Sequence, residues 1–139
     1  MLLVPRLLED MLATGRWPRD HSESLLQNLK SRAAPELIQR LAPEESHLYL
    51  YPPPFHTVRE LNKTNAFWTW PQAAPDGIDF DLALEIGDFG LGSDAPILLD
   101  YREDNVNPSV IRLRWRAGVP NEWVVMAPDF QTFVEVLGL

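Results

Sequence analysis

The chain has 139 residues, the size of one folded domain, so we expect a single domain over 1–139. Its 20 acidic residues outnumber its 12 basic ones and leave a net charge of −8, which argues against general nucleic-acid binding because that depends on Lys and Arg. It has no cysteine, which excludes disulfides, thiol nucleophiles and the common structural zinc sites.

The start of the chain, MLLVPRLLEDML, is apolar but interrupted by charges, so it predicts an amphipathic helix and no signal peptide. No segment approaches the roughly 20 apolar residues of a membrane span. We therefore expect a cytoplasmic protein that does not contact the membrane.

Helical periodicity dominates the first part of the chain. The predicted helices cover residues 2–14, 21–33 and about 35–41. Leu25, Leu26 and Leu29 are the apolar side of the second one. The β-prone run HLYLY then predicts a strand over 47–51, which three consecutive prolines end, and a short helical turn is expected over 55–61.

The second part of the chain has strand-like patterns with short connections between them, and short connections favour antiparallel pairing. The predicted strands cover residues 80–86, 97–101, 109–116 and 122–126. An amphipathic helix over 128–137 ends the chain. The predicted class is therefore α+β, with leading helices, a mainly antiparallel sheet and a closing C-terminal helix packed on it.

The acidic residues are concentrated in one segment. Residues 76–104 hold nine acids and a single arginine, so this segment carries the whole net charge of −8, while the rest of the chain has 11 acidic and 11 basic residues. Such a segment favours binding to a basic surface, since complementary charge speeds the encounter of two proteins. The alternative is that these acids only keep the protein soluble.

Glycines and aspartates in the same segment invite other interpretations. GDFGLGS (87–93) resembles a phosphate-binding loop, but it has no Lys and its acids repel phosphate, so we expect a tight turn between two strands. The spacing of Asp76, Asp79 and Asp81 does not fit a calcium loop. The three histidines are far apart in sequence, so we predict no metal site, no cofactor and no catalytic residue.

The ordered motifs of the second half resemble a known family. IGDFGLGSDAPILLDYR (86–102) is followed by PSVIRLRW, then by the Trp-containing NEWVVMA and by the Phe-rich FQTFVEVLGL. This order is similar to that of the SUKH superfamily, the Smi/Knr type of bacterial immunity proteins and fungal cell-wall regulators. The resemblance covers residues 80–139 and, in outline, the leading helices.

The resemblance implies an α+β fold that binds another protein and has no shared catalytic residue. Many bacterial members are immunity proteins that neutralise a toxin, often a nuclease. We therefore expect a non-enzymatic immunity protein, a monomer or weak dimer, that binds a toxin domain through its acidic surface. The predicted partner-binding residues are Asp79, Asp81, Asp88, Asp94, Asp100, Tyr101, Glu103 and Asp104. The alternatives are a regulatory or scaffold domain without a toxin partner and a small hydrolase that uses its carboxylates.

Two further sets of side chains have both a structural and a functional interpretation. Arg112, Arg114 and Arg116 alternate on one face of a predicted strand, where they either pair with acids of neighbouring strands, which we favour, or face a partner. The aromatic residues of the middle segment are expected in the core more than at an interface. They are Tyr49, Tyr51, Trp68 and Trp70.

Overall fold

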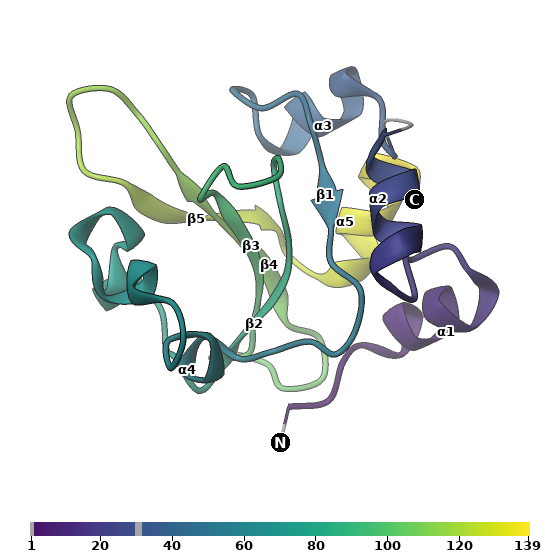
Figure 1. Ribbon diagram of the computed structural model, residues 1–139, viewed down its shortest axis with the longest axis horizontal. Helices are drawn as coiled ribbons and strands as arrows, with labels where there is room; N and C mark the ends of the chain where they lie inside the picture. Colours follow the sequence, from purple (N-terminus) through teal and green to yellow (C-terminus); the bar gives the residue numbers. More distant parts are fainter. Residues whose placement is uncertain (1, 30–31) are drawn as a thin grey trace.

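A five-stranded antiparallel sheet forms the centre of the computed structural model, which describes residues 2–29 and 32–139 (Figure 1). Its strands are β1 (Tyr49–Leu50), β2 (Ala83–Asp88), β3 (Pro96–Asp100), β4 (Ser109–Arg114) and β5 (Glu122–Ala127). Each strand pairs with the next one along the chain, so β1 and β5 are the two edges. The α+β class with an antiparallel sheet is confirmed.

Helices cover both faces of this sheet (Figure 1). The helices on the first side are α1 (Arg6–Thr14), α2 (His21–Leu29), α3 (Pro35–Leu41) and α5 (Phe130–Leu137). On the second side are α4 (Val58–Leu61) and three short 3₁₀ turns, η1 (Ala66–Thr69), η2 (Pro71–Ala73) and η3 (Pro75–Gly77). Among the described residues, no helix combines the length and the apolar character that crossing a membrane requires.

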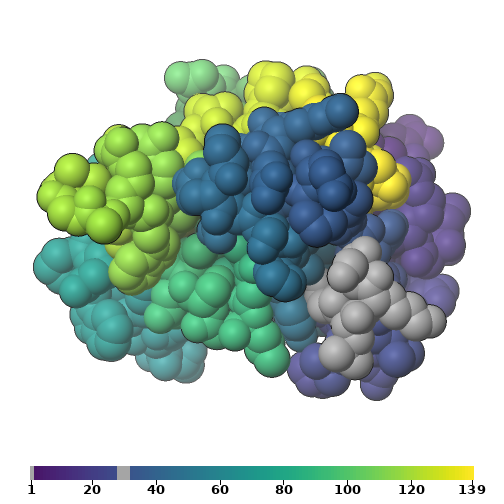
Figure 2. Space-filling model, turned by 90° about the horizontal axis from the view of Figure 1, so that it is seen from above, coloured from purple at the N-terminus to yellow at the C-terminus, as the bar shows by residue number. Residues whose placement is uncertain are grey.

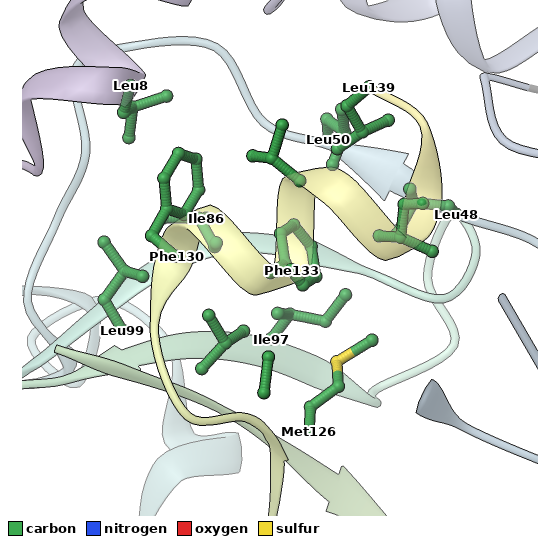
Figure 3. Packing of buried hydrophobic residues seen from close by; sticks show 14 of the residues in the cluster. Leu8, Leu48, Leu50, Ile86, Ile97, Leu99, Met126, Phe130, Phe133 and Leu139 are labelled. Atoms are coloured by element: carbon green, nitrogen blue, oxygen red, sulfur yellow. The ribbon is translucent and has the colours of Figure 1, made fainter. Parts of the chain in front are cut away.

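The larger core lies between the sheet and α5. Strand side chains alternate between the two faces, and one face of β2, β3 and β4 supplies branched apolar residues to this core. Phe133 of α5 is fully buried among them, and Phe130 stacks on it with the ring centroids 5.9 Å apart (Figure 3). Burial of one such side chain stabilises the fold by about 1.5–3 kcal/mol.

A smaller core fills the opposite face of the sheet. It joins Leu98 and Ile111 of the sheet to Val58 of α4 and to the aromatic residues of η1. Trp68 of η1 stacks on Trp123 of β5, with ring centroids 6.3 Å apart and planes inclined by 9°. The segment between β1 and β2 is therefore part of the fold and not a free linker.

The first two helices differ from their predicted limits. Pro5 has an extended conformation with ψ 143°, so α1 begins at Arg6 and residues 2–5 are not helical. Helix α2 ends at Leu29, whereas the prediction reached residue 33; residues 30 and 31 and the Leu29 side chain lie outside the described part of the chain. The predicted burial of Leu25 and Leu26 was wrong, because Ser24 instead turns inward and donates a 2.6 Å hydrogen bond to the Leu50 carbonyl.

Strand β2 begins and ends later than predicted. Asp79 accepts a 2.9 Å hydrogen bond from the backbone N–H of Asp81, and this turn delays the start of the strand to Ala83. The strand then continues through Gly87, where a Cβ would lie only 2.7 Å from the Tyr49 carbonyl oxygen. Glycine is thus required there by the close approach of β1, and the tight turn follows between β2 and β3 as expected.

Candidate functional site

The β2–β3 hairpin separates the predicted partner-binding residues into two groups. Ala83 pairs with Asp100, and Asp88 pairs with Pro96, so the start of β2 and the end of β3 lie together. Six strand residues at about 3.3 Å each set the two ends of the hairpin about 16 Å apart. The predicted residues at the first end are Asp79, Asp81, Asp100, Tyr101, Glu103 and Asp104, and those at the other end are Asp88 and Asp94.

Asp88 is not on the surface, which corrects its assignment to a binding surface. Its side chain is buried, and its Oδ1 accepts a 2.6 Å hydrogen bond from the N–H of Phe89 and a second bond from the hydroxyl of Ser93. Burial raises the pKa of Asp88, although these hydrogen bonds oppose the rise. The carboxyl group therefore orders the turn between β2 and β3 and is not accessible to a partner.

Tyr101 is also buried, and its assignment is corrected for the same reason. The hydroxyl group donates a 2.9 Å hydrogen bond to the carbonyl oxygen of Leu3. Burial raises the pKa of Tyr101 to about 12. The residue thus holds the beginning of the chain against the end of β3.

Two of the remaining acids are neutralised by arginines. Arg102 forms a two-pronged ion pair with Asp100, with N–O distances of 3.0 and 2.8 Å. Arg59 of α4 pairs with Asp81 in the same way, at 3.1 and 3.3 Å. The Arg102–Asp100 pair lies beside Asp79, whose carboxylate forms no ion pair with an arginine among the described residues.

The loop between β3 and β4 brings charge and apolar surface together. Asp104 accepts 2.8 Å hydrogen bonds from the N–H groups of Val106 and Asn107, which lower its pKa and hold it ionised. This turn leaves the Val106 side chain 70% exposed, and Leu3 beside it is 73% exposed. The loop lies at the same end of the molecule as the amino terminus (Figure 1).

Three pockets among the described residues border this loop: one of about 240 Å³, lined by Arg6, Val106 and Phe130 among others, and two larger ones. One, of about 440 Å³, lies between the amino-terminal segment and the loop and is lined by both Leu3 and Val106. The other, of about 330 Å³, is lined by Asp100, Glu103 and Asp104. We call the accessible part of this region the loop 101–108 surface; it consists of the exposed Leu3, Glu103, Asp104 and Val106 and the partly exposed Asp79 and Asp100.

Sequence reasoning missed the two apolar members of this surface. The available signal for Val106 was a single apolar residue inside the polar run EDNVNP. Leu3 carried no such signal, because it was assigned to the apolar side of a helix that in fact begins at Arg6. The exposure of both residues follows from the conformation of the loop and of the first residues of the chain.

The other end of the hairpin carries a smaller group. Asp94 is exposed with a positive φ of 53°, and its carbonyl oxygen accepts a 2.8 Å hydrogen bond from the indole N–H of Trp115. It therefore helps to join two hairpins and lies outside the loop 101–108 surface.

The predicted pairing of the arginine row with acids of neighbouring strands holds for Arg114 and Arg116, whereas Arg112 pairs with an acid of the loop between α3 and β1. Arg112 is buried with its Nη1 2.6 Å from Oε1 of Glu44. Arg114 lies opposite Glu122 in the β4–β5 register and pairs with it, and Arg116 reaches the same carboxylate at 3.1 Å. The row thus joins strands and loops of the protein to one another.

The aromatic residues divide between core and surface. Tyr49 and Trp68 are buried, Tyr51 is partly buried, and Trp70 is 51% exposed. The expectation of core packing therefore holds for two of the four, and Trp70 lies on the surface.

One carboxyl group was not singled out from the sequence. Glu85 of β2 is partly buried, and burial together with the nearby Asp88 charge raises its pKa to about 8. Elsewhere in the described part of the chain, the three histidines are exposed, and no group of three or more His, Cys, Asp or Glu side chains is arranged to hold a metal ion.

Comparison of the chain with models of protein families, with curated proteins and with solved structures finds no match in any of the three. The loop 101–108 surface is therefore interpreted from its own geometry and charge. That geometry joins exposed apolar side chains to uncompensated carboxylates, a combination that suits contact with another protein.

Proposed function

We propose that this chain is a non-enzymatic protein-binding domain, an immunity protein that neutralises a toxin domain through the loop 101–108 surface. Two independent arguments support this function. One is the resemblance of its ordered strand motifs to the SUKH superfamily, and the other is the composition of the surface itself. The toxin domain is expected to have a basic binding cleft, as nucleases do.

The observation that carries the proposal is the exposure of Leu3 and Val106 on either side of one pocket, next to ionised carboxylates. Protein interfaces combine an apolar centre with a polar rim. Complete burial of one such aliphatic side chain contributes about 1.5–3 kcal/mol. Two of them supply a hydrophobic centre that an isolated acidic patch lacks.

The carboxylates define the kind of partner. Asp79 and Glu103 form no ion pair among the described residues, and Asp104 uses only backbone donors, so their negative charge is open to an approaching protein. A cluster of negative charge attracts a basic cleft and raises the rate of association. Asp81 and Asp100 contribute less, because each already pairs with an arginine.

The test first looks for a toxin gene next to the gene of this protein, which the proposal predicts, and then uses its toxin domain. Co-expression is expected to restore the growth of cells that produce the toxin, and the purified proteins are expected to form a tight complex. Val106→Lys is expected to weaken the complex at least about tenfold, which corresponds to about 1.4 kcal/mol. Glu103→Lys is expected to lower the association rate several-fold, with the largest effect at low salt.

The control is Glu36→Lys, which makes the same change of charge on α3, at the opposite end of the sheet from the loop (Figure 1). It is expected to leave both rate constants unchanged. Unaltered protection and affinity in Val106→Lys and Glu103→Lys would show that another surface binds. If the stable cellular partner is not a toxin, the regulatory or scaffold interpretation is the right one.

A further inference from the structure

The two edges of the sheet are protected to different extents. At β1 the outward carbonyl groups are capped by side chains: the Ser24 hydroxyl donates to Leu50 at 2.6 Å, and the Trp17 indole donates to Tyr51 at 2.8 Å. At β5, no residue of 2–29 or 32–139 outside β4 forms a hydrogen bond with the strand backbone. Alternate N–H and C=O groups of β5 are therefore open to a further strand.

Strand β5 also lacks two of the features that usually block an open edge, lysine and proline. Its sequence, EWVVMA, has no Lys and no Pro, although prolines stand at positions 120 and 128 on either side. Val125 is 67% exposed at its middle. The register shift that leaves Met126 without a partner lies near one end, so Glu122–Val125 stays regular. A regular open edge of four residues with an exposed valine is suited to strand addition.

The charge distribution favours a second copy of the chain as the added strand. The loop 101–108 leads into β4, and Val110 near the start of β4 pairs with Ala127 at the end of β5. At the other end of β5, Glu122 lies opposite Arg114. Each β5 edge thus has an acidic loop at its C-terminal end and, at its N-terminal end, a hairpin whose two arginines share the single carboxylate of Glu122 and leave one net positive charge. This hairpin projects from the body of the molecule (Figure 2).

An antiparallel two-fold pairing brings these opposite ends together, with the hairpin of each copy alongside the acidic end of the other. Like charges do not meet at the edge itself, because residues 109–139 hold three arginines and three acids and are neutral. The acids of β2 lie three strands away from the edge, about 14 Å, which exceeds the screening length of about 8 Å in physiological salt. The net charge of −8 therefore opposes this contact only weakly.

We infer that β5 is the contact edge of a homodimer, in which two copies join their sheets by antiparallel β5–β5 pairing. The interface is separate from the function proposed above, since it uses the edge of the sheet and not Leu3 or Val106. The interface is isologous, meaning that both copies use the same residues, so Val125 of each copy becomes less exposed to solvent when the two copies pair.

The test measures the molar mass of the full chain by light scattering at increasing protein concentration. The wild type is expected to rise from 15.9 kDa toward twice that value. Val125→Asp is expected to remain monomeric, since it places a carboxylate against the partner's edge strand. The matched control is Val106→Asp, at a valine of similar exposure on the loop, and it is expected to dimerise as the wild type does.

Amide hydrogen exchange of the wild type provides a measurement that needs no variant. Exchange of the outward amides of β5 is expected to slow as the dimer forms, while that of β1, at the opposite edge of the sheet, stays the same. A wild type that is monomeric at every concentration overturns the inference, and so does a dimer that Val125→Asp leaves intact. Toxin binding by Val125→Asp is expected to persist, so the dimer and the proposed function fail independently.

Discussion

The hydroxyl group of Tyr101 lies 2.9 Å from the carbonyl oxygen of Leu3 and donates a hydrogen bond to it across 98 positions of the chain. This bond attaches the amino-terminal segment to the end of β3. It therefore sets the position of the exposed Leu3 side chain beside Val106.

Replacement Tyr101→Phe removes this hydrogen bond and retains the ring. We expect the free energy of unfolding in urea to fall by about 0.5–1.5 kcal/mol, the usual net value of one hydrogen bond. Affinity for the toxin domain is expected to fall as well, because Leu3 is no longer held in place. Tyr51→Phe is the control, since the Tyr51 hydroxyl forms no hydrogen bond among the described residues. Equal stability of the two variants would contradict the role of the bond.

Gly87→Ala is expected to destabilise the protein. The added Cβ would lie 2.7 Å from the carbonyl oxygen of Tyr49, so β1 and β2 must separate. We expect a loss of about 1–3 kcal/mol, as for other overpacked sites. Gly90→Ala makes the same change where the nearest atom is 3.7 Å away and is expected to have little effect. Thermal unfolding of both variants measures the difference, which vanishes if β1 does not contact Gly87.

Glu85 is expected to make stability depend on pH. Burial, and then Asp88, raise its pKa from 4.5 in the unfolded chain to about 8 in the folded one. The folded state therefore binds the proton more tightly, and the free energy of unfolding falls as pH rises from about 4.5 to about 8. Each tenfold difference in proton affinity is about 1.4 kcal/mol, so a pKa difference of this size corresponds to at most about 5 kcal/mol. Because Glu85 is only partly buried, we expect a smaller fall of roughly 1–3 kcal/mol.

Glu85→Gln is expected to reduce the fall of the free energy of unfolding with pH. The variant is expected to be more stable than the wild type near pH 8, where the Glu85 carboxyl group of the wild type ionises. Urea unfolding at a series of pH values measures it, and Glu9→Gln controls for the loss of one exposed carboxyl group. A wild-type stability that rises across the same range would contradict the assignment to Glu85.

Asp88→Lys is expected to damage the fold and not just a binding surface. It removes the acceptor for Ser93 and Phe89 and buries a cation in their place. We expect a loss of at least about 3 kcal/mol, in line with other unpaired buried charges. Glu103→Lys makes a similar change of charge at an exposed position and is expected to keep nearly wild-type stability. Circular dichroism with urea titration separates the two variants, and equal stability would show that Asp88 does not order the turn.

The amino-acid sequence by itself determined the class of the fold. Local sequence patterns predicted an element near each α-helix and strand of the described residues, because apolar spacing and β-prone residues are imposed locally by each element, but they did not predict the three 3₁₀ turns. The short connections also predicted the antiparallel pairing. The limits of the elements depended on contacts distant in sequence, as at Gly87, where β2 continues between β1 on one side and β3 on the other.

Composition likewise revealed that the negative charge is concentrated in residues 76–104. Only the tertiary structure decided which of those acids are available. The β2–β3 hairpin places these acids at two opposite ends. Asp88 is buried and accepts a hydrogen bond from a backbone N–H. Asp81 and Asp100 are neutralised by arginines. Exposure and pairing depend on which segments meet in space, and a one-dimensional pattern does not contain that information. The same reason explains why Leu3 and Val106, 103 positions apart, became neighbours only in the folded chain.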